Sequence, residues 1–158
     1  TAIWTIPKER MKAGRPHNVY LSQQALDILV AFKTCFGASS YLHPGRYETK
    51  LPISAATLNR VIDATVTLIR GRGEDFEAFT VHDLRRTAST LLHEVGFDSD
   101  WIEKCLAHEQ RGVRAIYNKA EYAEQRRTML QTWADMLDGW IHSGGNVVPI
   151  RRQAAVVA

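Results

Sequence analysis

The sequence predicts an α+β fold: a mainly α-helical domain with a small antiparallel β-sheet at its start. Two strand-like runs occur near the beginning of the chain, and apolar residues then recur at helical spacing as far as residue 142. A length of 158 residues favours one domain that is large enough for a real core. With 45% hydrophobic and 23% charged residues, the composition is that of a globular protein and not of a disordered one.

The predicted sheet is a single hairpin. Ile3–Pro7 and His17–Leu21 have the composition of two short strands. The basic, glycine-containing segment Lys8–Pro16 joins them. We therefore expect an antiparallel pair with a basic connection.

Two helices should follow, each beginning at a serine cap. Ser22 is expected to cap the first helix and Gly37 to end it. The apolar positions of this helix are Ala25, Leu26, Leu29, Val30, Phe32 and Phe36. Residues 38–53 contain prolines and glycine and are expected to form a loop. Ser54 should cap the second helix, which the Arg-Gly-Arg-Gly sequence at 70–73 breaks. Its predicted buried stripe is Leu58, Val61, Ile62, Thr65, Leu68 and Ile69.

The third predicted helix has two different faces. Thr80 and Asp83 form a capping-box-like start, and Gly96 should end the helix at its C′ position. One face is apolar and consists of Leu84, Ala88, Leu91, Leu92 and Val95. The opposite face carries His82, Arg85, Ser89 and His93.

Three further helices and a tail complete the prediction. Ser99 is expected to cap a short helix with a core face of Trp101, Ile102, Cys105 and Leu106. Gly112–Asn118 should form another short helix, and Ala123–His142 a long one. The inward residues of the long helix are expected to be Met129, Trp133, Met136, Leu137, Trp140 and Ile141. We thus divide the chain into a domain, residues 1–142, and a C-terminal tail, residues 143–158.

Basic residues gather in two clusters although the net charge is only +3. The first cluster contains Lys8, Arg10, Lys12 and Arg15, and the second contains Arg111, Arg114, Lys119, Arg126 and Arg127. Such clusters suit a polyanion, although a solvated face is the commoner meaning of a charge run. Cys35 and Cys105 have no metal-binding spacing and are expected to be buried free thiols in a reducing cytosol. The sequence lacks both a membrane-spanning run and a signal peptide, which favours a cytoplasmic location.

Four side chains carry the strongest functional pattern. His82 and Arg85 lie about 60° apart around a helix, so they share a face. His108 and Tyr117 follow, nine residues apart. Cationic donors for phosphoryl oxygens, an imidazole that handles a proton and an oxygen nucleophile are the groups that phosphodiester cleavage requires.

This pattern resembles the catalytic residues of the tyrosine recombinases, the phage integrase family, and most closely the integrases of prophages and genomic islands. The resemblance covers Thr80–Trp140 and extends more weakly back to Trp4. It implies the integrase catalytic fold and site-specific DNA recombination through a 3′-phosphotyrosyl link. It also implies double-stranded attachment-site DNA as substrate, a tetramer on DNA, DNA-bending accessory proteins, and no cofactor or metal.

The resemblance gives each residue a role. Tyr117 would be the nucleophile, with Tyr122 as the alternative. Arg85 would bind the scissile phosphate, whereas the neighbouring Arg86 better fits a surface ion pair. His82 and His108 would contact the same phosphate, and His82 would also help to take the tyrosine proton. The general acid would be Lys12, which lies on the predicted hairpin, with Lys8 as its rival.

The resemblance also leaves open questions. The family's earlier catalytic arginine and its N-terminal DNA-binding domain have no counterpart here, so we expect an excerpt of a longer protein that is inactive alone. The tail is expected either to fray or to dock on a neighbouring protomer. Alternatives are a non-catalytic DNA-binding relative, a type IB topoisomerase, and a metalloprotein that uses His82, His93 and His108.

Overall fold

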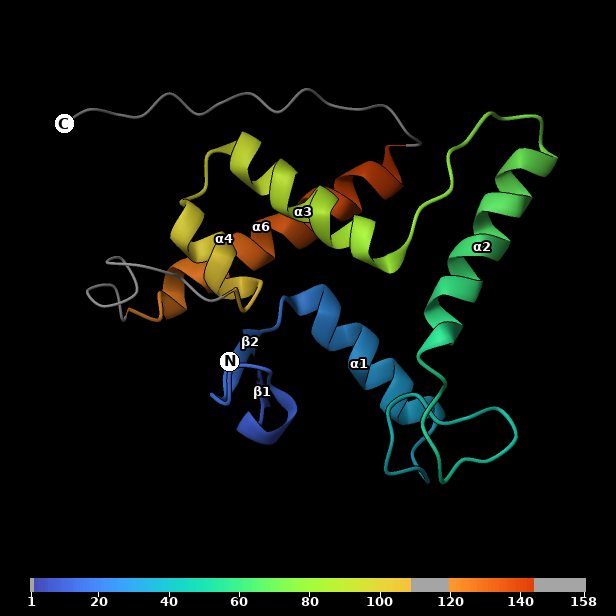
Figure 1. Cartoon of the computed structure of the whole chain (residues 1–158), viewed down its shortest axis with the longest axis horizontal. Coiled ribbons are helices and arrows are strands. Elements are labelled where there is room, and N and C mark those ends of the chain that lie inside the picture. The colour runs from blue at the N-terminus through green and yellow to red at the C-terminus, as the bar shows by residue number, and fades with distance from the viewer. Residues whose placement is uncertain (1, 109–119, 144–158) are drawn as a thin grey trace. The chain divides into compact units, whose positions relative to one another are not determined.

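The computed structural model describes residues 2–108 and 120–143. Its elements are, in order, β1 (Ile3–Ile6), the 3₁₀ turn η1 (Lys8–Arg10), β2 (His17–Tyr20), α1 (Gln23–Cys35), α2 (Ala56–Gly71), α3 (Val81–Val95), α4 (Ser99–Cys105) and α6 (Ala123–His142) (Figure 1). Helices predominate, and the one sheet among the described residues has two strands. The mainly helical α+β prediction is confirmed at this level. The helix predicted at Gly112–Asn118 and the tail beyond Ser143 lie outside the described residues.

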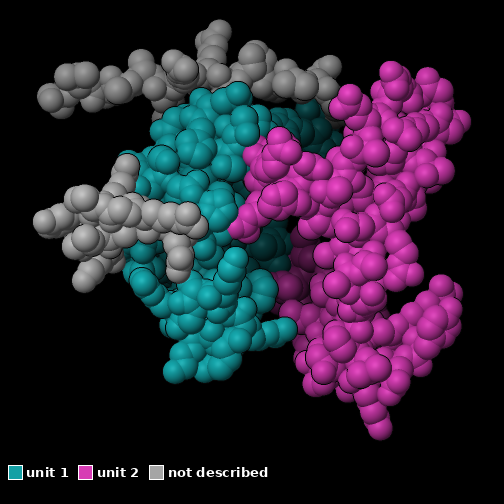
Figure 2. Space-filling model, viewed as in Figure 1, with its two compact units in different colours: residues 1–26, 89–158 teal, residues 27–88 magenta. Residues whose placement is uncertain are grey.

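The chain divides into two compact units, which Figure 2 shows in different colours. Unit 1 contains residues 1–26 and 89–158, and unit 2 contains residues 27–88. The hairpin, α4 and α6 belong to unit 1, α2 belongs to unit 2, and α1 and α3 each have residues in both units.

The N-terminal hairpin has the predicted antiparallel pairing. Ile3 lies opposite Tyr20, and Ile6 lies opposite His17. A turn within the connection is closed by the N–H of Gly14, which donates to the carbonyl of Met11 over 3.0 Å. Gly14 has a φ of +62°, a left-handed conformation that glycine adopts without steric cost. The connection therefore folds back tightly enough to pair the strands.

Local capping chemistry explains where α1 begins and where α3 ends. The Ser22 hydroxyl accepts the N–H of Ala25, as predicted. Gly96 follows α3 with a φ of +97° and donates to the carbonyl of His93, while Phe97 donates to Leu92. These two bonds form a Schellman motif, so the predicted C′ glycine is confirmed.

Two caps differ from the prediction by one position. The N-cap of α4 is Asp98, not Ser99, and its carboxylate accepts the N–H of Asp100 over 2.7 Å. Helix α2 begins at Ala56 after Ala55, while the hydroxyl of Ser54 accepts the N–H of Ala56. At α4 the neighbouring polar residues Asp98 and Ser99 can both accept free helix N–H groups, and the carboxylate of Asp98 does so; at α2 the serine still accepts a free N–H, and only the helix boundary is shifted.

The core of unit 1 lies where α3, α4 and α6 each contribute one buried side chain. Leu92, Ile102 and Met129 form the buried cluster. The partly buried side chains around it are Phe97, Trp101, Cys105, Leu106 and Trp133. The start of α1 is held to α6 by polar contacts, because the N–H of Gln23 donates to Gln131 Oε1 over 2.9 Å. The predicted core face of α4 is confirmed by this packing.

The predicted buried stripe of α2 is wrong for most of its members. Only Ile62 and Val66 are buried on this helix, and Ile69 is half-buried. The side chains of Leu58, Val61, Thr65 and Leu68 are exposed. Apolar residues cover more than one side of α2, so periodicity alone did not indicate which side meets a neighbour. For the same reason Leu84, Leu137 and Ile141, which were expected to be inward, are exposed.

The two cysteines lie in different environments. Both are free, but Cys35 is exposed, which contradicts the expectation of a buried thiol. Cys105 is partly buried, and burial raises the pKa of its thiol although Arg126 opposes this shift. Cys35 lies at the last position of α1, where an apolar periodicity no longer ensures a packed neighbour.

We expect iodoacetamide to alkylate Cys35 faster than Cys105 in the folded chain. The thiolate is the form that reacts. Burial raises the pKa of Cys105 and limits access to its sulfur, so less thiolate is available for alkylation there. Peptide mass mapping over a time course measures the two rates. Equal rates in the folded chain would contradict the burial of Cys105, and denaturation should make the rates equal.

A helix that crosses a membrane must be both long and apolar. In the two described stretches, 2–108 and 120–143, no helix combines the length and the apolar character that a membrane crossing requires.

Candidate active site

His82 and Arg85 lie on the first turns of α3, in unit 2, and both side chains are exposed. Asp83 fixes the start of this helix, because its carboxylate accepts the hydroxyl of Thr80 over 2.8 Å and the N–H of Thr80 over 3.0 Å. These hydrogen bonds hold the pKa of Asp83 below its usual value. The predicted capping box is confirmed. It sets the helix frame that places His82 and Arg85 on one face.

The neighbouring Arg86 has a different role. Its Nη1 lies 3.1 Å from Asp83 Oδ1, in an ion pair along the helix. The side chain of Arg86 is 74% exposed, so this pair contributes little stability. The surface ion pair that the sequence predicted for Arg86 is therefore present.

His108 is held by two bonds to one residue at the end of α4, in unit 1. Its backbone N–H donates to the carbonyl of Glu103 over 3.0 Å, and Nδ1 lies 2.7 Å from Glu103 Oε2. A carboxylate only accepts, so Nδ1 carries the proton and Nε2 is the nitrogen left for another partner. Sequence reasoning missed Glu103. Its position five residues before the histidine, at a helix end, was the available signal.

The backbone around His108 adopts a helix-ending motif in which alanine replaces the usual glycine. Ala107 has a φ of +53° and donates to the carbonyl of Lys104 over 3.2 Å. Together with the His108 bond this is a Schellman arrangement. A left-handed alanine costs about 1–2 kcal/mol, so the surrounding bonds must maintain the conformation.

The hairpin connection carries both candidate lysines. Lys12 lies in the turn that the Gly14–Met11 hydrogen bond closes, and its side chain is exposed. Lys8 begins η1 and is also exposed. Both lie in unit 1, and no contact among residues 2–108 and 120–143 distinguishes them as general acid, so Lys12 remains the prediction from the sequence.

The candidate nucleophile Tyr117 lies outside the described residues, as do Arg111, Arg114 and Lys119 of the second basic cluster. The alternative nucleophile, Tyr122, is described. It is the N-cap residue of α6, with a φ of +49°, and its half-buried ring lies 6.5 Å from that of Trp101 between centroids. This placement gives Tyr122 a structural role at the start of a helix.

Arg126 contradicts its assignment to a basic surface cluster. Its side chain is 1% exposed, whereas that of the adjacent Arg127 is 24% exposed and pairs with Glu124 over 2.8 Å. Arg126 lies three residues before Met129 and seven before Trp133, on the buried side of α6. That spacing could have revealed its burial, but a charge among other charges suggested solvent.

The structure thus places two groups of candidate residues in separate units. His82 and Arg85 share a helix face in unit 2, and Lys12 and His108 belong to unit 1. In the described part of the chain, no three His, Cys, Asp or Glu side chains form a metal-binding group. His93, the third histidine of the metalloprotein alternative, has Nδ1 2.7 Å from the carbonyl of Ser89 on its own helix. The residues therefore offer imidazole and guanidinium donors without a metal-ligand set among those described.

Comparison with known proteins gives a consistent result. The chain is 41% identical to the prophage integrase IntZ of Escherichia coli (strain K12) over 92% of its own length and 34% of that protein's length. It is 40% identical to the prophage integrase IntA of the same strain, over 85% of the chain and 31% of IntA. It is 35% identical to the integrase of Shigella phage Sf6, over 86% of the chain and 34% of that protein. No solved structure matches the chain.

The coverage of these relatives is partial. The chain spans about a third of the length of each relative. The sequence model of the phage integrase family matches residues 1–124, a range that includes every candidate catalytic residue from Lys12 to Tyr117. On this match, and on its identity with several integrases, the chain belongs to the phage integrase family, the tyrosine recombinases.

Proposed function

We propose that the full-length protein integrates or excises a mobile DNA element by cutting and rejoining DNA at specific attachment sites. The observation that carries the proposal is the order and spacing of His82, Arg85, His108 and Tyr117 within a chain of the phage integrase family. The names of its relatives, which are prophage and phage integrases, support the same activity.

The proposed reaction balances as a transesterification. The phenolic oxygen of Tyr117 attacks the scissile phosphorus and forms a 3′-phosphotyrosyl bond, while the bond from phosphorus to the 5′-oxygen breaks. His82 helps to take the phenolic proton, and Lys12 gives a proton to the departing 5′-oxygen. Attack by a 5′-hydroxyl on the phosphotyrosyl bond reverses these steps, so rejoining requires no ATP.

Arg85 and His108 would hold the phosphate in this scheme. A guanidinium donates two parallel hydrogen bonds to the non-bridging oxygens, where charge gathers in the transition state. His108 would contribute Nε2, because its Nδ1 faces Glu103. The exposed positions of His82, Arg85 and His108 support contact with a polyanion.

We further propose that residues 1–142 form the C-terminal portion of an integrase catalytic domain and that residues 143–158 form a tail. The catalytic arginine expected upstream, and an N-terminal DNA-binding domain, would then belong to the remainder of the protein. The partners would be double-stranded attachment-site DNA, further copies of the protein in a tetramer, and accessory DNA-bending proteins. The proposal of a larger protein is supported by the relatives, of which the chain spans about a third.

Trapping the covalent intermediate tests this function. The full-length protein is incubated with attachment-site duplexes nicked beside the cleavage position, so that a short fragment diffuses away after cleavage. A DNA adduct that survives denaturant, with the protein on the 3′-phosphate side and a free 5′-hydroxyl, is the expected result. DNA binding without any adduct would favour a non-catalytic relative, and the opposite polarity would contradict the mechanism.

We expect Glu103→Gln to lower the cleavage rate about tenfold at saturating DNA. An amide can turn its N–H2 group toward Nδ1, so it no longer fixes the orientation of the His108 ring or which ring nitrogen carries the proton. Outer partners that orient histidines in metal sites contribute about 10–100-fold, which sets the scale. Single-turnover adduct formation measures the effect, and Glu94→Gln, at an exposed position of α3, is the control. Equal rates for both variants would show that Glu103 does not act through His108.

A further inference from the structure

Arg126 is the most deeply buried charged side chain among the described residues of unit 1, with 1% of its surface exposed. Arginine is rarely this buried unless several acceptors surround it. Arg126 lies on the first turn of α6, the described helix that follows His108 in the sequence. The burial of Arg126 therefore depends on the groups that its guanidinium contacts.

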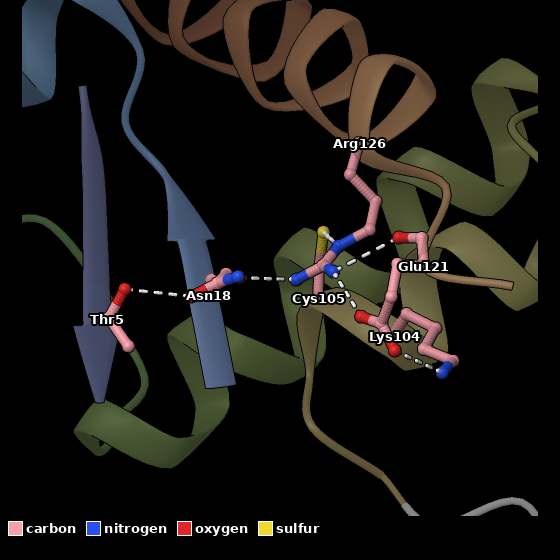
Figure 3. Close-up of polar contacts among 6 residues, drawn as sticks. All are labelled: Thr5, Asn18, Lys104, Cys105, Glu121 and Arg126. Carbon is pink, nitrogen blue, oxygen red and sulfur yellow. Dashed lines mark hydrogen bonds and ion pairs between the residues drawn. The ribbon is translucent and has the colours of Figure 1, made fainter. Parts of the chain in front are cut away.

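The guanidinium of Arg126 joins three segments of the chain. Nη2 donates to the carbonyl of Asn18 on β2 over 2.6 Å, and Nη1 donates to the carbonyl of Glu121 over 3.2 Å. Nε donates to the sulfur of Cys105, at the end of α4, over 3.5 Å. Figure 3 shows these contacts converging on one side chain. The ring of Tyr20 stacks on the same group, with its centroid 4.9 Å from Cζ.

Glu121 is attached a second time through its side chain. Its carboxylate lies 3.5 Å from Nη1 of Arg126 and 3.2 Å from Nζ of Lys104 (Figure 3). Lys104 follows Glu103, the residue that holds His108. Two consecutive residues of α4 therefore hold His108 and Glu121, which lie on either side of the candidate nucleophile in the sequence.

The backbone next to His108 and next to Glu121 has a left-handed conformation that neighbouring bonds must maintain. Ala107 and Tyr122 have φ angles of +53° and +49°, and they are the two non-glycine residues with positive φ among those described. Ala107 adjoins His108, and Tyr122 adjoins Glu121. Each left-handed residue costs about 1–2 kcal/mol and persists only where neighbouring bonds enforce it. For Tyr122, Arg126 bonds the preceding carbonyl and also donates its own N–H to the Tyr122 carbonyl over 2.9 Å.

We propose that Arg126 is a positioning residue for Tyr117, acting through Glu121 and the start of α6. This role rests on the proposed function, in which Tyr117 attacks the scissile phosphate. A nucleophile displaced by about 1 Å can lose about 100-fold in rate, so a fixed attachment at Glu121, four residues away, influences the reaction without touching DNA. Lysine cannot replace arginine here, because one ammonium group cannot reach acceptors on β2, α4 and residue 121 in the guanidinium geometry.

The test compares Arg126→Lys with Arg127→Lys in the full-length protein. Single-turnover cleavage of nicked attachment-site DNA is measured at saturating DNA, together with the Kd for the uncut duplex and the Tm of each variant. We expect Arg126→Lys to reduce the cleavage rate about 10–100-fold while the Kd changes less than about threefold. Arg127→Lys makes the same chemical change at a side chain whose ion pair is with Glu124, and it should cleave almost normally.

A second variant keeps the test decisive if Arg126→Lys does not fold. Glu121→Gln leaves the backbone carbonyl in place and weakens only the carboxylate contacts of a side chain that is 68% exposed. We expect it to lower the cleavage rate about threefold or more, again with the Kd maintained, whereas the control Glu124→Gln has no effect. Unchanged cleavage by Glu121→Gln would overturn the positioning role if Arg126→Lys cannot be measured.

Different experimental outcomes would overturn the positioning role of Arg126 and the proposed function. Wild-type protein without an adduct, or an adduct that survives Tyr117→Phe, overturns the function and the positioning role together. Normal Tyr117-dependent cleavage by Arg126→Lys overturns the positioning role alone. A loss that follows only the folded fraction, or a loss confined to the Kd, also overturns it.

Discussion

Tyr117→Phe in the full-length protein is expected to abolish covalent capture of nicked attachment-site DNA while DNA binding stays within about twofold of wild type. Phenylalanine retains the ring but lacks the oxygen that forms the bond to phosphorus. Loss of a catalytic nucleophile typically lowers the rate by roughly 10³-fold or more. Denaturing gels of protein on labelled DNA measure the adduct, and a mobility-shift titration at fixed salt measures the affinity.

Tyr122→Phe is the matched control for that result. Tyr122 occupies the N-cap position of α6 and its ring lies against that of Trp101, so removing its hydroxyl leaves the ring contact intact. We expect this variant to form the adduct at a rate close to wild type. If Tyr117→Phe still forms the adduct and Tyr122→Phe does not, Tyr122 is the nucleophile.

Arg85→Ala should lower the cleavage rate about 10²–10³-fold at saturating DNA. A fixed donor at oxygens that gain charge in the transition state typically contributes this much. The effect should fall mainly on the rate and less on the Kd, because one phosphate contact among many contributes modestly to affinity. Single-turnover cleavage and salt-matched binding titrations separate the two quantities.

Arg86→Ala provides the comparison on the same helix turn. Its guanidinium pairs with Asp83 and is 74% exposed, so its loss should change the cleavage rate less than about threefold. Similar losses in both variants would show that α3 contributes general positive charge and not one specific phosphate ligand. Arg85→Lys should remain well below wild type, because an ammonium does not reproduce the bidentate geometry.

Local sequence signals predicted the elements of the chain well. The long helix Ala123–His142 has the predicted bounds, and the hairpin strands differ from the prediction by one residue each at their C-terminal ends. Capping at Ser22, Thr80 and Gly96 depends on side chains within a few residues, so the sequence contains the information directly. The common face of His82 and Arg85 follows in the same way from helix periodicity.

The identity of the buried faces was predicted less well. On α2 the sequence offered two apolar sides, and packing buried the side of Ile62 and Val66. On α6 it suggested a solvated Arg126 and an inward Ile141, but the structure buries the arginine and leaves Ile141 73% exposed. A periodic pattern identifies apolar positions. It does not identify the neighbour that will cover them.

The sequence by itself determined the family, the order of the elements and the spacing of the candidate catalytic residues, because each depends on residue types close together in the chain. Tertiary structure alone decided that Arg126 lies in the interior with its Nη2 2.6 Å from the carbonyl of Asn18. That contact joins β2 to α6, which lie at opposite ends of the chain. Burial of a charge becomes favourable only when acceptors from distant segments surround it, and this condition arises only after the chain has folded.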